Sequence, residues 1–246
     1  MNAELISLIF FLLLFIVATL YSSVGHGGAS GYLALMAFFS FEPDTMRPSA
    51  LLLNVFVSLI AFMQYYRSGY FQWKLFVPFA VASIPAAFLG GLITVDAGLY
   101  KKILGVLLFF PIIKLAGIKF QTEQSIKKIK NYSALIIGAV IGFVSGMIGI
   151  GGGIILSPVI LLLHWADMKH TAAVSALFIF VNSVAGLAGL FANSFEYKPE
   201  MGMMIAIAFA GGLTGSYFGA RKFGSELLKK LLATVLLVAS VKLLFT

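Results

Sequence analysis

Two glycine-rich motifs, each inside an apolar stretch, are the part of this sequence best suited to bind a ligand. The first motif, SSVGHGGASG, covers Ser22 to Gly31, and the second, SGMIGIGGGIILSP, covers Ser145 to Pro158. An offset of 124 residues aligns three pairs of glycines: Gly25 with Gly149, Gly27 with Gly151, and Gly28 with Gly152. Matching glycine breaks in the two halves of a hydrophobic chain are typical of a transporter's binding site.

We expect a helix to begin after each glycine cluster, at about Ala29 and Ile154. The first N–H groups of a helix have no partner within it and carry about half a positive charge. Such helix starts bind anions readily. The two motifs therefore predict a small anion held between two helix N-termini.

Further candidates are loop residues and polar side chains inside later apolar segments, where polar groups are costly and tend to be functional. The candidate substrate-binding residues are Ser22, Ser23, Gly25, His26, Gly27, Gly28, Asn54, Ser58, Ser145, Gly149, Gly151, Gly152, Gly153, Asn182 and Ser183. Hydrogen bonds between helices explain the two asparagines equally well.

Two basic residues have alternative interpretations. His26 could donate to an anion, titrate with the substrate, or pack against loop carbonyls. Arg47 could guide anions to an entrance or be an exposed residue that sets topology. Close helix packing is the better explanation for another set of glycines: Gly186, Gly189, Gly211, Gly212 and Gly215.

Several classes of protein are excluded by what the sequence lacks. There is no cysteine, and the nine carboxylates all fall near the ends of apolar segments or between them. Three scattered histidines make a metal site improbable, and no nucleophile–base pair is visible. We therefore expect no enzyme activity, no cofactor and no metal.

Composition predicts an all-α polytopic membrane protein. Of the 246 residues 61% are hydrophobic and only 11% are charged, against about 25% in soluble domains. The net charge of +8 comes from short basic clusters between apolar runs, so lipid and topology explain it better than nucleic acid does. The apolar segments are 5–24, 29–41, 49–66, 75–95, 99–117, 132–147, 154–165, 171–195, 201–220 and 227–245.

The second half repeats the first. Besides the glycines, Ser49-Ala50-Leu51 matches Ser175-Ala176-Leu177, and Lys101-Lys102 matches Lys229-Lys230. We divide the chain into a first repeat (1–117), a basic connector (118–131) and a second repeat (132–246), which form one membrane domain.

The basic residues indicate how each repeat is threaded. If the segments at 5–24 and 29–41 form a hairpin, and likewise 132–147 and 154–165, the 17 basic residues divide unequally between the two sides, as the positive-inside rule expects. One broken spanning helix in each place gives a nearly even division. The hairpin favours two inverted repeats, each a glycine-broken re-entrant hairpin plus three transmembrane helices. It places the connector in the cytoplasm and both termini outside the plasma (inner) membrane.

The twin motifs, Pro158, the repeated Ser-Ala-Leu and the duplication resemble the sulfite exporter TauE/SafE family over nearly the whole chain. GIGGGIILSPVI at 149–160 is the most specific part. The resemblance implies a permease that exports small sulfur oxyanions, such as sulfite or organosulfonates, by alternating access. An anion channel and a non-transporting assembly factor are the alternatives, and a homodimer is compatible with the glycine-rich faces.

Overall fold

Long apolar runs bounded by glycine, proline or polar residues form the helices of this chain. The computed structural model describes residues 3–23, 25–115, 126–192 and 197–221, with isolated positions at 237, 241 and 244. Within these ranges the chain is all helical and has no strand. The helices are α1 (Ala3–Ser22), α2 (Ala29–Phe38), α3 (Pro43–Arg67), α4 (Trp73–Leu92), α5 (Ala97–Leu115), α6 (Asn131–Ile148), α7 (Gly153–Leu162), α8 (Met168–Ala192) and α9 (Pro199–Arg221).

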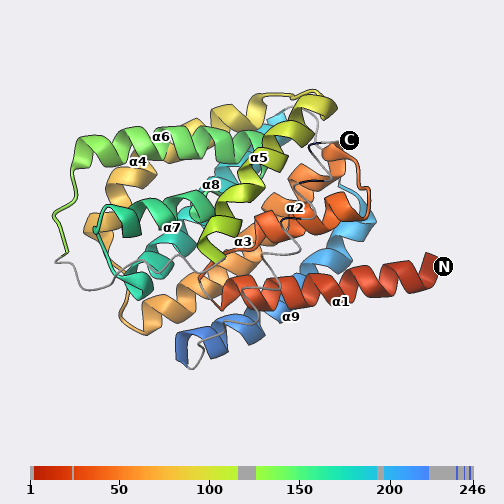
Figure 1. Ribbon diagram of the computed structural model, residues 1–246, viewed down its shortest axis with the longest axis horizontal. Coiled ribbons are helices and arrows are strands. Elements are labelled where there is room, and N and C mark those ends of the chain that lie inside the picture. Colours follow the sequence, from red (N-terminus) through yellow and green to blue (C-terminus); the bar gives the residue numbers. More distant parts are fainter. Residues whose placement is uncertain are drawn as a thin grey trace.

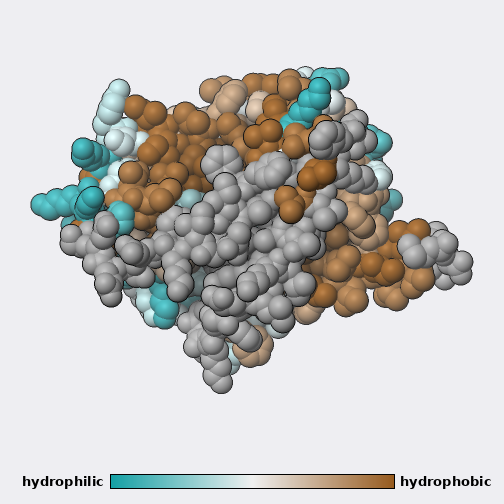
Figure 2. Space-filling view, in the orientation of Figure 1, coloured by the Kyte–Doolittle hydropathy of each residue, from teal (hydrophilic) through white to brown (hydrophobic). Residues whose placement is uncertain are grey.

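Six of these helices, α1, α3, α4, α6, α8 and α9, are long and apolar enough to cross a membrane. Many of their large hydrophobic side chains are exposed, among them Leu8, Val81 and Val140. Figure 2 shows hydrophobic residues over the upper middle and the lower right of one face and hydrophilic residues at its left end and upper right. The prediction of an all-α, polytopic protein is therefore confirmed.

The two short helices, α2 and α7, fold back along the long helices that precede them. Each has 10 residues, or about 15 Å of helix, which is half a membrane. The ring centroid of Phe10, early in α1, lies 5.1 Å from the ring centroid of Phe41, just beyond α2. Near the start of α6, Lys127 N donates to the carbonyl of His164, just beyond α7. Each pair is thus a hairpin and not one broken helix.

The helices run between two ends of the molecule. At the first end, where α1 begins, Lys198 Nζ donates to Thr45 Oγ1 and joins the starts of α9 and α3. At the second end, where α6 begins, Lys169 Nζ donates to the Tyr70 hydroxyl and joins the start of α8 to the α3–α4 turn. In Figure 1, α1 starts at the right and α6 at the left, so the two hairpins enter from opposite ends.

Helices from the two halves of the chain exchange partners. The fourth helix of each half packs against the hairpin of the other half, because α4 lies along α6 and α8 while α9 lies along α1 and α3. Glycines allow the close approach. Gly142 lies against the backbone of Ser83 in the α4–α6 seam, and Gly215 against the backbone of Thr19 in the α1–α9 seam.

The packing interpretation of the later glycines agrees with their contacts. A Cβ added at any of them would meet a neighbouring helix: Gly186 meets Gly146 and Leu51, Gly189 meets Phe88 and Gly91, Gly211 meets Phe15, Gly212 meets Val57, and Gly215 meets Thr19.

The start of α3 differs from the one that the sequence predicts. α3 begins at Pro43 and not at Ser49, because proline is well tolerated at the first position of a helix. The predicted helix at 227–245 and most of the 118–131 connector lie outside the described residues.

Candidate functional site

Glycines with left-handed backbone shape both loops. Gly25 and Gly28 in the first loop have φ of 74° and 98°, and their counterparts Gly149 and Gly152 have φ of 89° and 77°. Gly28 is the N-cap of α2 and Gly152 is the N-cap of α7. Both half-helices therefore begin in the same way, with their first N–H groups turned toward the glycine loop.

The two loops meet at Asn54, in the middle of α3. A Cβ added at Gly27 would collide with Oδ1 of Asn54, and one at Gly151 would collide with Nδ2 of the same side chain. Both would also press on Cγ2 of Ile179, in the middle of α8. The amide of Asn54 thus lies between the two loops, and only glycine fits on either side of it.

Asn54 also receives the first amide of α2. The backbone N–H of Ala29 donates to Asn54 Oδ1 over 3.1 Å, so this residue of α3 caps a neighbouring helix. Its Nδ2 is buried without a hydrogen-bond partner. The Oδ1 atom therefore accepts a hydrogen bond from the protein, whereas Nδ2 is a donor without a partner beside Gly151.

Other buried hydroxyls near the loops are also without a partner. Ser183 Oγ lies near Gly151, Ser145 Oγ lies 3.4 Å from a Cβ built at Gly152, and the Tyr32 hydroxyl lies beside Gly28. An unsatisfied buried donor costs about 1–3 kcal/mol. These groups form a cluster of unused donors where the half-helices begin.

Four other predicted site residues donate to their own helices and do not belong to this cluster. Ser22 Oγ donates to the carbonyl of Thr19, Ser23 Oγ to Leu20, Ser58 Oγ to Asn54, and Asn182 Nδ2 to Phe178. The Oδ1 atom of Asn182 is buried without a partner, but it is an acceptor and cannot bind an anion.

The remaining predicted glycines lie against the long helices. Gly25 packs on Ala172 of α8, and Gly149 packs on Arg47 of α3. Gly153, the first residue of α7, packs on Ile179. The contacts of Gly25 and Gly149 hold each loop in place on the half of the molecule from which it does not come, whereas that of Gly153 lies within its own half.

His26 has a partner that the sequence did not predict. Its Nε2 lies 3.0 Å from Ser157 Oγ on α7, which lies 2.8 Å from Ser175 Oγ on α8. His26 is only 4% exposed. Its ring nitrogen therefore contacts a hydroxyl of the other half of the chain.

Both interpretations of Arg47 were wrong. The side chain is 7% exposed, so it is neither an exposed topology signal nor an entrance residue. Its guanidinium donates five hydrogen bonds of 2.8–3.1 Å to the carbonyls of Gly90, Gly91, Ile93 and Gly146. These carbonyls end α4 and α6, where the helix dipoles are negative, so the buried charge is stabilised without a carboxylate.

A family model decides the class of protein. The model described as sulfite exporter TauE/SafE matches residues 10–243. The chain belongs to the TauE/SafE family. It is therefore a multi-pass membrane transporter of a small molecule and not an enzyme.

Relatives of this TauE/SafE transporter carry the same general description. A probable membrane transporter protein of Sinorhizobium fredii is 38% identical over 237 residues, 94% of this chain and 95% of that protein. One of Methanocaldococcus jannaschii is 29% identical, covering 76% and 74% of the two chains, and one of Bacillus subtilis is 24% identical, covering 85% and 87%. No solved structure matches this chain.

Sequence reasoning missed Ser157, Ser175 and Ile179 at the centre of this transporter. Ser157 stands in the second glycine motif and Ser175 in the repeated Ser-Ala-Leu, so both lay in segments already singled out. Ile179 carried no signal, because an apolar side chain in an apolar helix has no distinguishing chemistry.

Charged groups of the TauE/SafE transporter gather at its two ends. In the described ranges, no group of three or more His, Cys, Asp or Glu residues could hold a metal ion.

At the second end, Asp167 Oδ1 accepts hydrogen bonds from the backbone N–H groups of Lys169 and His170 and so caps α8. Burial tends to raise the pKa of Asp167, but hydrogen bonds from His170 and Lys169 outweigh it and lower that pKa below its ordinary value.

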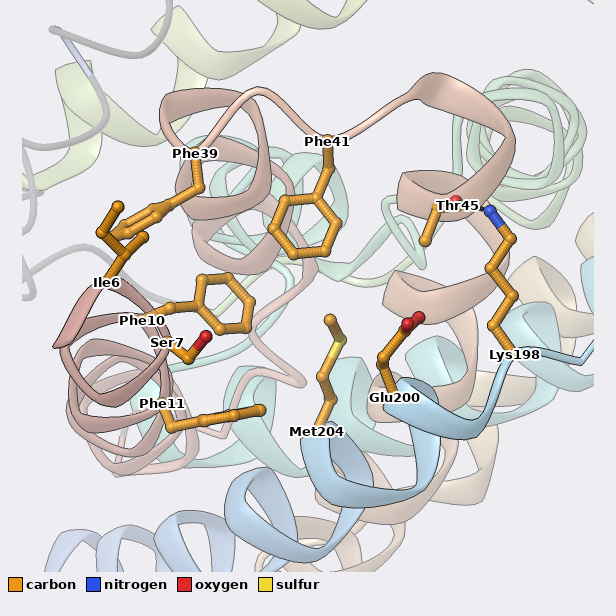
Figure 3. Close-up of a pocket in the computed structure, with 10 residues that line it drawn as sticks. All are labelled: Ile6, Ser7, Phe10, Phe11, Phe39, Phe41, Thr45, Lys198, Glu200 and Met204. Carbon is orange, nitrogen blue, oxygen red and sulfur yellow. Dashed lines mark hydrogen bonds between the residues drawn. The ribbon is translucent and has the colours of Figure 1, made fainter. Parts of the chain in front are cut away.

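A cavity of about 420 Å³ lies at the first end, between α1 and α9 (Figure 3). Phenylalanines from α1 and the α2–α3 turn form one wall, and Lys198, just before α9, and Glu200 of α9 stand on the other side (Figure 3). The lining residues are Ile6, Ser7, Phe10, Phe11, Phe39, Phe41, Thr45, Lys198, Glu200 and Met204. None of the predicted site residues lines it.

Proposed function

We propose that this transporter exports a small sulfur-containing oxyanion, sulfite or an organosulfonate, with the charged group held between the N-termini of α2 and α7. The family description supports the substrate class. The site supports an anion, because the observation that carries the proposal is a cluster of buried donors without partners at two helix starts.

Each donor has a role in this proposal. Asn54 Nδ2 and Ser183 Oγ face Gly151 from two different helices, so an oxyanion there would accept from both. The first N–H groups of α7 add to them, and so does Ala29 N–H when it leaves Asn54. Binding the anion would remove the cost of leaving these donors unsatisfied.

The proposed site holds the anion with neutral groups. The guanidinium of Arg47 is committed to backbone carbonyls, so it contributes no direct contact. Dipoles and neutral donors bind an anion more weakly than an ion pair does. Weak binding suits a carrier, which must release its substrate on the other side.

Alternating access follows from the contact of the two loops. Both are packed on Asn54 in this conformation, so the anion enters when one loop moves away and leaves when the other does. The opposite courses of α1 and α6 support an inverted repeat. We place the second end in the cytoplasm because Lys127, Lys128 and Lys130 lie beside it.

A single chain in the plasma (inner) membrane is the transporting unit in this proposal, with both termini outside. The glycine faces that would allow a homodimer are occupied within the chain by α1 and α4.

The test is flux of sulfite, thiosulfate, sulfate and sulfoacetate in proteoliposomes, with binding followed by thermal shift. We expect Ser183→Ala to leave stability unchanged or higher, because it removes an unsatisfied donor, and to weaken anion binding about 3- to 10-fold. Ser58→Ala is the matched control, because that hydroxyl donates to its own helix. Absence of flux for every sulfur oxyanion with folded protein contradicts the proposal, and unitary currents in planar bilayers would indicate a channel instead.

A further inference from the structure

A chain of buried polar groups links the two halves of the molecule and has no part in the proposed anion contacts. It runs from the His26 imidazole in the first loop to Ser157 on α7 and Ser175 on α8. These residues are 4%, 1% and 0% exposed. His26 is the one member that can gain or lose a proton near neutral pH.

The hydroxyl of Ser157 has one hydrogen and more than one acceptor. Besides His26 Nε2 at 3.0 Å, it lies 2.9 Å from the carbonyl of Gly153 in its own helix. An imidazole without a proton on Nε2 accepts from Ser157. A protonated imidazole donates to it, so the hydrogen of Ser157 must then turn toward Gly153 or Ser175.

Protonation of His26 therefore changes the hydrogen bonding of the first turn of α7. Gly153 is the first residue of that helix, directly after the N-cap Gly152. The same turn provides the N–H groups that hold the anion in the proposed function. A positive charge on His26, in the loop that leads to Gly27, would also attract that anion in a medium of low dielectric.

Other ionisable groups around the loop do not take this role. From α3, the Tyr65 hydroxyl donates to the carbonyl of Ser23, and from α1 the Tyr21 hydroxyl accepts from Ser30. On α8, the charged side chains are at its start, where Lys169 contacts Tyr70 and His170 contacts Asp167. Arg47 of α3 binds carbonyls at the first end.

We propose that His26 is the proton-carrying residue of a proton–anion symporter: the hydrogen-bonded chain His26–Ser157–Ser175 couples one proton on Nε2 to one anion bound between α2 and α7. The inference rests on the proposed function. In each cycle Nε2 takes one proton from the side where the anion enters and gives it up on the side where the anion leaves. Ser157 and Ser175 are positioning residues that transmit the protonation state to α7.

The experiment uses proteoliposomes of the full chain loaded with methanesulfonate or, in parallel, sulfite, and a pH-sensitive dye in the lumen. An outward anion gradient should make the lumen of wild-type liposomes alkaline, because protons leave with the anion. The His26→Gln variant should lose the anion-driven pH change at least tenfold, whereas anion exchange at equal concentrations on both sides should fall by a smaller factor, because only the attraction of the His26 charge is removed. Methanesulfonate carries no proton of its own near neutral pH, so its signal reports the protein alone.

Two further variants keep the test decisive if His26→Gln does not fold. Ser157→Ala should bind anion but shift the pH dependence of flux, which a purely structural role would not do. His170→Gln, at the second end beside Asp167, should behave as wild type.

The outcomes separate the two proposals. Anion flux without luminal alkalinisation, or flux through His26→Gln with coupling intact, overturns the symport inference and leaves the anion carrier standing. Luminal acidification also overturns it, because it would indicate exchange of anion for proton. Absence of flux for any sulfur oxyanion overturns both proposals.

Discussion

The two glycine loops have left-handed glycines at two aligned positions and differ in what surrounds those glycines. Two of the three aligned pairs have matching roles, since Gly25 and Gly149 begin the loops and Gly28 and Gly152 begin the returning helices, all four with positive φ. Yet Gly149 rests on a buried arginine where Gly25 rests on an alanine, and His26 stands where the second loop has Ile150. The two loops therefore provide two similar helix starts, and the individual side chains give each start different chemical surroundings.

The largest effect is expected from removing the arginine that distinguishes the second loop. Arg47→Met leaves the carbonyls of Gly90, Gly91, Ile93 and Gly146 without their donor, so we expect a loss of about 3–5 kcal/mol in unfolding free energy. Thermal or denaturant unfolding in detergent measures it. Arg67→Met is the control, because Arg67 is exposed and should change stability by about 0.5 kcal/mol or less. Equal effects of the two variants would show that Arg47 does not hold the ends of α4 and α6.

A second comparison separates backbone strain from collision with Asn54. Gly151→Ala introduces both, because Gly151 has φ of 70° and faces Nδ2 of Asn54. Gly27→Ala introduces the collision without a positive φ, and Gly69→Ala introduces positive φ in open space. We expect both loop variants to lower anion flux at least tenfold and Gly151→Ala to cost about 1–2 kcal/mol more stability than Gly27→Ala.

Gly69→Ala should be destabilised only by the strain of a positive φ, and it should transport normally. If it lowers flux as much as the loop variants do, strain and not contact with Asn54 explains the requirement for glycine.

The smallest effect is expected at the starts of the corresponding helices α8 and α3. Asp167 caps α8 through its side chain, whereas Glu42, the N-cap of α3, makes no such hydrogen bond. Asp167→Ala should therefore cost about 0.5–1 kcal/mol and Glu42→Ala less.

The cap at Asp167 also predicts a pH dependence. The pKa of Asp167 is lower in the folded protein than its ordinary value of 3.8, so its stabilisation is present above about pH 4 and is lost as the pH falls through the lowered value. Unfolding measured at about pH 7 and pH 3 should show the wild type losing its advantage over Asp167→Ala at the lower pH. A constant difference between the two proteins would contradict it.

Much of this architecture could be predicted because it rests on patterns along the chain. The length of the apolar segments predicted the spanning helices, and the glycine clusters predicted the two hairpins. The convergence of the loops was expected. The sequence could not show that Asn54 and not Asn182 lies between them, because each asparagine stands in a similar apolar segment. Arg47 was misread because its acceptors are backbone carbonyls far away in sequence, and carbonyls have no sequence signature. The contacts of His26 with Ser157 and Ser175 likewise depend on how two halves pack, which no local pattern records.

Because α4 and α9 each pack on the other half of the chain, neither half is a complete packing unit by itself. A half expressed alone would leave one face of its own hairpin uncovered, because the helix that packs on that face belongs to the other half. Two separately expressed halves, cut within the connector, should find each other in the bilayer and rebuild both seams. The two halves are thus joined by packing at the α1–α9 and α4–α6 seams.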